Sequence, residues 1–241
     1  MIDVSKWQEE PTKIAVPITG KNQDEIKREV ILINDSIDNI DLIEWRIDYI
    51  DDLSLSNLKK CNDIIRDIRI PLILTLRSID EGGNEINDDY FKVLSQCIES
   101  LSFDILDVEI DRPFDINSLI NQAHQHDIGV IISHHDLKHV LGEASMIDKF
   151  KLMENHHADI AKIAIMPTDE KDVLELINAS LFAKQQLQIP LISMAMGEKG
   201  MISRIMPSHF GSSVSFGSLD KSSAPGQINV TDLRRIINLL R

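Results

Sequence analysis

The sequence predicts an α/β fold in which eight parallel strands, each followed by a helix, close into a (β/α)8 barrel. Three observations predict it. Short apolar runs recur about every 30 residues, the length of one strand–helix unit; amphipathic stretches lie between them; and no Gly/Ser-rich linker interrupts the 241 residues. We therefore expect a single catalytic domain over residues 1–241, of the TIM-barrel class.

The apolar runs give eight strands, in chain order and at near-regular spacing. They are predicted at Lys13–Thr19, Asp41–Asp48, Pro71–Arg77, Ile105–Ile110, Gly129–His135, Ile160–Met166, Pro190–Met196 and Ser213–Ser218.

The stretches between the strands carry apolar residues at helical spacing. The clearest is Asp169–Gln188, and the segment after the seventh strand, Lys199–Met206, has room for only a turn or two. The remaining predicted helices are Asn22–Asp35, Ser54–Arg66, Asp88–Leu101, Asp115–His126, Glu143–His156 and Gln227–Leu240.

An open, doubly wound sheet is the alternative fold. Such a sheet usually has a Gly-rich turn after its first strand. Residues 19–21, Thr-Gly-Lys, match that turn poorly, so the closed barrel is favoured.

The composition narrows the class of protein. The formal net charge is −14, which argues against nucleic-acid binding, although a few converging arginines could still bind an anionic substrate. Cys61 and Cys97 lie far apart in predicted helices and follow no metal or redox spacing, so we interpret them as reduced structural thiols. With no apolar signal segment in Met1–Thr12 and no run long enough for a membrane span, we expect a soluble, cytoplasmic protein.

Charged residues share one face of several predicted strands. Successive strand residues point to opposite faces, and in residues 43–48 (Ile-Glu-Trp-Arg-Ile-Asp) the charged positions alternate with apolar ones. The apolar face packs against helices, so the charged face must point into the barrel, where charges are costly unless paired. Five strands supply inward polar groups: Glu44, Arg46 and Asp48; Thr75 and Arg77; Asp107 and Glu109; Ser133 and His135; and Lys162. Structural ion pairing inside the barrel is the alternative to a catalytic site.

Lys162 lies in the middle of an apolar strand. Partial desolvation favours its neutral, nucleophilic amine, which can attack a ketone and form an iminium that acidifies the neighbouring C–H. The sequence therefore predicts Schiff-base chemistry at Lys162. The alternative is a structural lysine paired to an inward carboxylate such as Glu109.

His135 ends the fifth strand, at the face of a barrel where a general acid/base belongs. His134 points to the opposite face, so the two histidines cannot bind one metal from regular strand geometry, and His139 could approach only from the loop. A zinc-hydrolase interpretation is therefore disfavoured.

Seven segments together resemble the type I 3-dehydroquinate dehydratases, the Schiff-base dehydroquinases of the shikimate pathway. They follow the family's order from the second strand to the last loop, and so cover nearly the whole chain. The segments are residues 44–48 (EWRID), 75–78 (TLRS) with 81–83 (EGG), 133–136 (SHHD), 161–164 (AKIA), 193–197 (SMAMG), 203–204 (SR), and 216–218 (FGS) with 223–227 (SAPGQ).

The resemblance implies a role for each of these residues. Lys162 forms the imine with 3-dehydroquinate, His135 is the general acid/base, and Glu81 orients His135. Arg204 pairs with the substrate carboxylate, residues 223–227 form a lid, and no metal or organic cofactor is needed. The resemblance also implies a homodimer. The remaining implied substrate-binding residues are Glu44, Arg46, Arg77, Ser223 and Gln227, with Met194, Met196 and Phe216 as apolar walls.

Two positions depart from the family pattern. His134 stands where an aromatic residue is expected, and Leu137 where Phe is common. Both departures are expected to affect packing only. Two other functions stay open: a Schiff-base aldolase, which would need a phosphate-binding loop, and a non-catalytic sugar-acid-binding barrel, which would be expected to lack Lys162 or His135.

Overall fold

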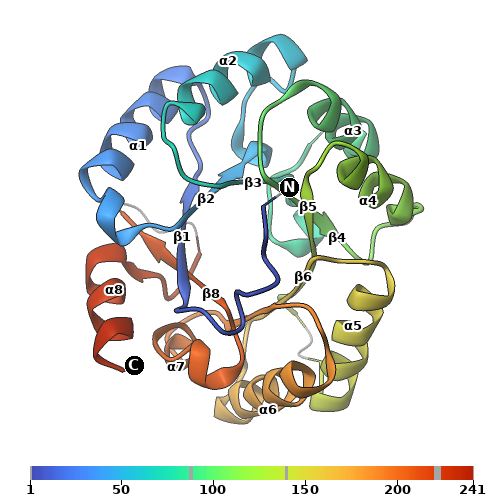
Figure 1. Ribbon diagram of the computed structural model, residues 1–241, viewed down its shortest axis with the longest axis vertical. Coiled ribbons are helices and arrows are strands. Elements are labelled where there is room, and N and C mark those ends of the chain that lie inside the picture. Colours follow the sequence, from blue (N-terminus) through green and yellow to red (C-terminus); the bar gives the residue numbers. More distant parts are fainter. Residues whose placement is uncertain (1, 87–88, 139–140, 220–223, 241) are drawn as a thin grey trace.

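The computed structural model describes residues 2–86, 89–138, 141–219 and 224–240. In these residues nine parallel strands form one sheet in the order β7-β6-β5-β4-β3-β2-β1-β8-β9. Viewed down the shortest axis, the strands surround a centre and the helices lie outside them (Figure 1). The strands are β1 (Lys13–Ile18), β2 (Leu42–Arg46), β3 (Leu72–Thr75), β4 (Ile105–Glu109), β5 (Gly129–Asp136), β6 (Ile160–Ile165), β7 (Leu191–Ala195), β8 (Val214–Ser218) and β9 (Ile228–Asn229).

The sheet closes on itself. Strand β1 pairs with both β2 and β8, and at the remaining junction the backbone N–H of Ser213 donates to the carbonyl of Leu191 at 2.7 Å. The predicted (β/α)8 barrel is therefore confirmed, and the alternative prediction of an open, doubly wound sheet is wrong.

Eight α-helices in the described residues cover the outside of the sheet. Asp169 caps α6, where its side chain accepts from the backbone N–H of Lys171 and Asp172 in a capping box. None of the described helices is long and apolar enough to cross a bilayer. The helices are α1 (Gln23–Asp35), α2 (Leu55–Arg66), α3 (Tyr90–Ser100), α4 (Ile116–Gln125), α5 (Glu143–Asn155), α6 (Glu170–Gln186), α7 (Met201–Ile205) and α8 (Val230–Leu239).

The eight predicted strands are confirmed, with small differences at their ends. The largest are in β2 and β3, which both end two residues early. Strand β2 stops at Arg46, and residues Ile47–Tyr49 form a 3-10 turn, so Asp48 is not on the strand. The last helix begins at Val230 rather than Gln227, because Ile228–Asn229 forms the short strand β9 beside β8. The Asn229 side chain caps α8 by accepting from Thr231 N–H.

Two apolar cores separate on the two faces of the sheet. The outer core lies between strands and helices and holds Leu72, Leu74 and Leu76, whereas Ile73 belongs to the inner core. The alternation predicted from the sequence is thus confirmed, and it leaves Lys162 inside the barrel with only 3% of its surface exposed.

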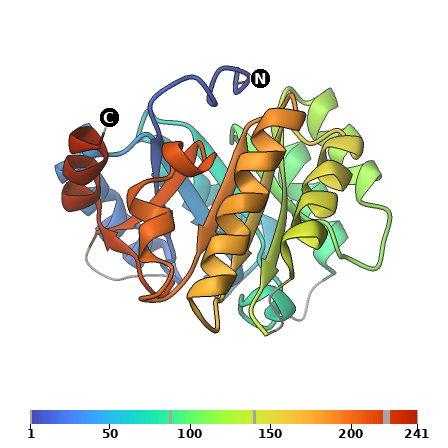
Figure 2. The same ribbon diagram turned by 90° about the horizontal axis from the view of Figure 1, so that it is seen from below.

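The N-terminal segment fills one end of the barrel. Val4 and Trp7 are buried in the inner core with Leu42, Ile105 and Ile131. Figure 2 shows this segment lying across the end of the barrel, above the strands. The Gln8 side chain donates to the carbonyl of Ile189, which ties the segment to the turn before β7. From the sequence, Met1–Thr12 was characterised only by the lack of an apolar signal segment, and this plug was not predicted.

Replacing Trp7 with alanine is expected to lower the free energy of unfolding by about 3 kcal/mol, because the change leaves a large cavity in the inner core. Urea denaturation followed by circular dichroism measures the change. The control is Leu239→Ala, whose side chain is 74% exposed and whose loss should matter by less than about 0.5 kcal/mol. An equally small effect in Trp7→Ala would mean that the plug does not stabilise the barrel.

Candidate active site

An open pocket with an empty volume of about 780 Å³ lies at the carboxyl ends of the strands. This is the face of a (β/α)8 barrel that carries active sites. All the predicted site residues line it except Ser223, which lies outside the described residues. Those that line it are Lys162, His135, Glu81, Glu44, Arg46, Arg77, Arg204, Gln227, Met194, Met196 and Phe216.

Lys162 projects from β6 into the floor of this pocket. Its Nζ donates to Asp107 Oδ2 at 2.9 Å and to Glu44 Oε1 at 3.3 Å, and it lies 5.0 Å from the centroid of the Phe216 ring. An inward carboxylate does pair with this lysine, as the structural alternative suggested, but the example named there, Glu109, is not its partner. Glu109 is one inward position closer to the carboxyl end of β4, where Arg77 and Arg112 bind it instead.

A buried ionic network holds Asp107 against Lys162. Arg77 Nη2 donates to Asp107 Oδ1 at 2.8 Å, and Ser133 Oγ donates to the same oxygen at 2.6 Å. Burial alone would raise the pKa of Asp107, but the cations of Arg77 and Lys162 outweigh it and hold the pKa at about 2. The alternation of apolar and charged residues along the fourth strand correctly placed Asp107 inside the barrel, but the sequence did not indicate a role for it. Its bridge between the two cations was not visible in sequence, because it depends on the register of three strands.

Glu81 and His135 form a close pair at one wall. Glu81 Oε2 lies 2.8 Å from His135 Nδ1 and also accepts from the His135 backbone N–H at 3.1 Å. Burial, together with the nearby cations of Arg77 and Lys162, holds the pKa of His135 well below its usual range, so the imidazole is neutral. Burial likewise raises the pKa of Glu81 to about 8, although Arg77 opposes this. Glu81 Oε2 and His135 Nδ1 therefore share one proton across their 2.8 Å contact.

Arg204, on α7, is a buried cation that forms no ion pair with a carboxylate among the described residues. Its Nη2 donates to the carbonyl of Pro225 at 3.3 Å, while Nε and Nη1 have no hydrogen-bond partner within the part of the chain that the structure describes. Burial lowers its pKa to about 10. An uncompensated buried charge is costly, so this side of the pocket is built to receive an anion.

Arg46 is held by the turn that follows its own strand. Its Nε and Nη2 donate to both oxygens of Asp48, at 2.8 and 2.9 Å. Asp48 also accepts from the backbone N–H of Arg77. Asp48 was expected to face the interior from the strand, but the 3-10 turn directs it sideways. It therefore orients Arg46 and does not line the pocket.

Residues 224–227 lie over the pocket beside the turn after β7. Gly197 N–H donates to the carbonyl of Pro225 at 3.0 Å. Gly226 has φ = 77°, and a Cβ there would stand 2.5 Å from the carbonyl oxygen of Gly197. Only glycine fits this close approach. Of the predicted lid, these four residues are described and Ser223 is not.

His134 faces away from the pocket, as the alternation predicted. Its Nδ1 lies 2.6 Å from Asp111 Oδ2, and it does not share a ligand position with His135. His139, the other histidine considered for a metal, lies outside the described residues.

The comparisons with known proteins agree with this geometry. Residues 14–241 match the family described as type I 3-dehydroquinase. A 3-dehydroquinate dehydratase of Alkaliphilus oremlandii (strain OhILAs) is 38% identical over 237 residues, covering 95% of this chain and 91% of the relative. A 3-dehydroquinate dehydratase of Clostridioides difficile (strain 630) is 37% identical over 238 residues, covering 95% of this chain and 91% of the relative.

A solved structure extends the match to three dimensions. It is the crystal structure of a type I 3-dehydroquinate dehydratase from Clostridium difficile with covalent modified comenic acid. It is 34% identical, has a TM-score of 0.90, and the match covers 95% of this chain and 92% of that one. Since the family match spans almost the whole chain and includes the pocket residues, the chain belongs to the type I 3-dehydroquinase family.

Proposed function

We propose that this chain converts 3-dehydroquinate to 3-dehydroshikimate and water, a step of the shikimate pathway, through an imine on Lys162. The observation that carries the proposal is a buried lysine amine at the floor of a pocket that also holds His135 and the buried guanidinium of Arg204, which has no carboxylate partner among the described residues. Membership of the dehydroquinase family favours this reaction over the aldolase and over a non-catalytic binding barrel.

The first step is attack by Lys162 Nζ on the C3 ketone. The ammonium must first lose a proton, and Asp107 and Glu44 are the carboxylates within hydrogen-bond distance of Nζ. Attack gives a carbinolamine, and loss of its hydroxyl as water gives the iminium. Because the iminium is positively charged, it acidifies the C2 proton.

The second step is proton transfer by His135. Nε2 of the neutral imidazole removes the C2 proton, and the resulting imidazolium returns it to the C1 hydroxyl, which leaves as water. When Glu81 is ionised it accepts from Nδ1–H, which fixes the tautomer in which Nε2 is the free base. Hydrolysis of the iminium then regenerates Lys162 and releases 3-dehydroshikimate.

The rest of the pocket binds the substrate. Arg204 pairs its guanidinium with the substrate carboxylate in a fork that lysine could not reproduce. Residues 223–227 close over the bound molecule. The hydroxyls contact Glu44, Arg46, Arg77, Ser223 and Gln227, and the ring packs against Met194, Met196 and Phe216.

Borohydride trapping tests the proposal. The protein is incubated with 3-dehydroquinate and sodium borohydride, and its mass is measured. We expect a covalent adduct that peptide mapping places on Lys162, and activity that survives exhaustive EDTA treatment. An unmodified mass in enzyme that turns over would exclude the imine, and full loss of activity with EDTA, restored by zinc, would favour metal catalysis.

The pH profile should depend on the proton that Glu81 and His135 share. When Glu81 is protonated and donates to Nδ1, Nε2 carries the ring proton and cannot act as a base. Since the pKa of Glu81 is about 8, kcat should be low at about pH 6 and rise through about pH 8 to a plateau. Glu81→Gln should lose this inflection and about 10- to 100-fold in kcat. The same inflection in Glu81→Gln would assign the titration to another group.

We propose further that the chain acts as a homodimer in the cytoplasm. An apolar patch on α6 includes Leu174, Leu181 and Phe182, which are 60%, 37% and 44% exposed, and such patches are typical of interfaces. Both cysteines are buried free thiols, as is usual in a reducing compartment. Light scattering after gel filtration tests the dimer, and cell fractionation tests the location.

A further inference from the structure

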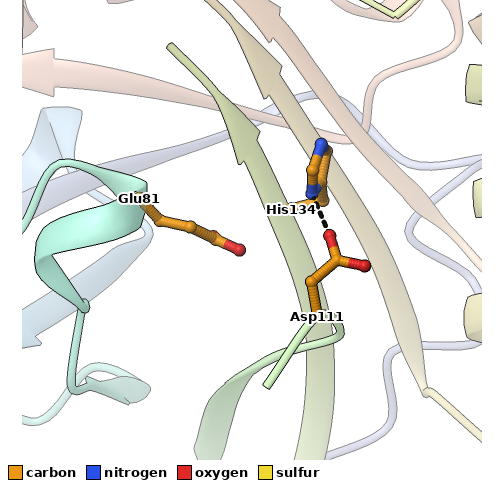
Figure 3. A group of neighbouring side chains, drawn as sticks. All are labelled: Glu81, Asp111 and His134. Carbon is orange, nitrogen blue, oxygen red and sulfur yellow. Dashed lines mark ion pairs between the residues drawn. The ribbon is translucent and has the colours of Figure 1, made fainter. Parts of the chain in front are cut away.

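Three potential metal ligands converge at the edge of the pocket, which one of them, Glu81, also lines. Glu81 comes from the 3-10 helix η3 (Ile79–Glu81), Asp111 from the turn after β4, and His134 from β5. Figure 3 shows their side chains directed toward one another, with the contact between His134 and Asp111 dashed. Each offers one ligand atom, and these atoms all lie within 4.8 Å of one another.

His134 is poorly satisfied by the protein alone. Its side chain is 14% exposed, and its Nδ1 lies 2.6 Å from Asp111 Oδ2. Apart from this ion pair, neither ring nitrogen has a hydrogen-bond partner among the described residues. Burial, together with the Lys149 cation, lowers the pKa of His134, which favours the neutral ring that binds metals.

The two carboxylates can both reach a bound ion. Each hydrogen bond that Glu81 accepts within the described chain ends on Oε2, so Oε1 is available. Asp111 is 52% exposed, which gives solvent access to the cluster. The Lys149 amine now binds Asp111 at 2.9 and 3.0 Å, and its long flexible side chain can swing into solvent when a dication replaces it.

We propose that Glu81, Asp111 and His134 form a binding site for a divalent transition metal such as Zn²⁺, and that occupancy inhibits the enzyme. One imidazole nitrogen and two carboxylate oxygens suit Zn²⁺ or Co²⁺, whereas Mg²⁺ prefers six oxygen ligands. The metal draws Glu81 toward His134 and away from His135. The inhibitory effect rests on the proposed function, because it acts through the role of Glu81 in orienting His135.

Metal binding is tested without reference to activity. Wild-type protein, His134→Phe and the control His124→Gln are dialysed against Zn²⁺, and bound metal is measured by elemental analysis. His124 is a matched control, because it also pairs with one aspartate, Asp159, at 2.9 Å, but belongs to no group of three potential ligands in the part of the chain that the structure describes. We expect wild type and His124→Gln to retain one more zinc ion per chain than His134→Phe. Equal zinc in all three would overturn the site.

Steady-state kinetics test the inhibition. Saturating Zn²⁺ should lower kcat by about 10- to 100-fold with little change in KM, while His134→Phe keeps its rate with and without zinc. Borohydride should still trap the substrate on Lys162 in the zinc-bound wild type, which separates this site from zinc bound at the lysine. Zinc binding that depends on His134 but leaves kcat unchanged would refute the inhibition. If the chain lacked dehydratase activity altogether, the dialysis result would still decide whether the metal site exists.

Discussion

Replacing Lys162 with alanine is expected to lower kcat for 3-dehydroquinate by about 10⁴-fold or more, the scale seen when a covalent nucleophile is removed. The reason is that no iminium can form, so the C2 proton keeps the low acidity that it has in the free ketone. The rate of 3-dehydroshikimate formation, followed by its ultraviolet absorbance, measures the loss. The borohydride adduct should vanish in the same variant.

The ion pairs of Lys162 call for a second variant. Alanine leaves Asp107 and Glu44 without one of their cations, and an unpaired buried charge can destabilise the fold by about 3–5 kcal/mol. Lys162→Arg keeps a positive charge beside both carboxylates, yet its guanidinium does not form the imine. It should unfold close to the wild-type midpoint in urea and be as inactive as Lys162→Ala. If either variant folds and keeps activity within about tenfold of wild type, the imine mechanism is contradicted.

His135→Asn is expected to lower kcat by about 10²- to 10⁴-fold, the usual contribution of a general acid/base. Lys162 is unaffected in this variant, so substrate should still be trapped by borohydride. The variants Lys162→Ala and His135→Asn thus separate the two steps of the reaction. Lys162→Ala cannot form the imine, whereas His135→Asn forms it but cannot transfer the C2 proton. This separation is checked by mass spectrometry of the borohydride-treated protein and by kcat measured under the same conditions.

The control for His135→Asn is His124→Gln, a change far from the pocket that should leave both kcat and trapping intact. If His135→Asn failed to trap substrate, His135 would also act in imine formation. If it kept wild-type kcat, the base would have to be a different residue.

Much of the fold could be predicted because it depends on local periodicity. Alternation in β2, β4 and β6 was enough to separate the outer face, with residues such as Val108 and Ile163, from the inner face that holds Lys162. The plug at the N-terminus could not be predicted in this way. Val4 and Trp7 are two apolar residues in a polar stretch, and their burial depends on an opening that exists only after the barrel closes.

The candidate site shows the same limit. Single positions such as Lys162 and His135 were found because a charged residue in an apolar strand is unusual. The ion pairs among the strand residues could not be predicted from alternation, because they depend on how far each strand is shifted against the next, and the pair of Glu81 and His135 was implied only by the family resemblance. Asp107, rather than Glu109, meets the lysine amine, and Asp48 turns toward Arg46 only because β2 ends early in a 3-10 turn.

The segment that fills the strand-start end of the barrel has a consequence for traffic through the enzyme. With Val4 and Trp7 buried against the interior residues, this segment fills the strand-start end of the barrel, and the pocket lined by Ala224, Pro225 and Gln227 lies at the opposite end. Substrate and product are therefore expected to pass at that end of the barrel, while the water lost from C1 is already inside the pocket when the iminium is hydrolysed.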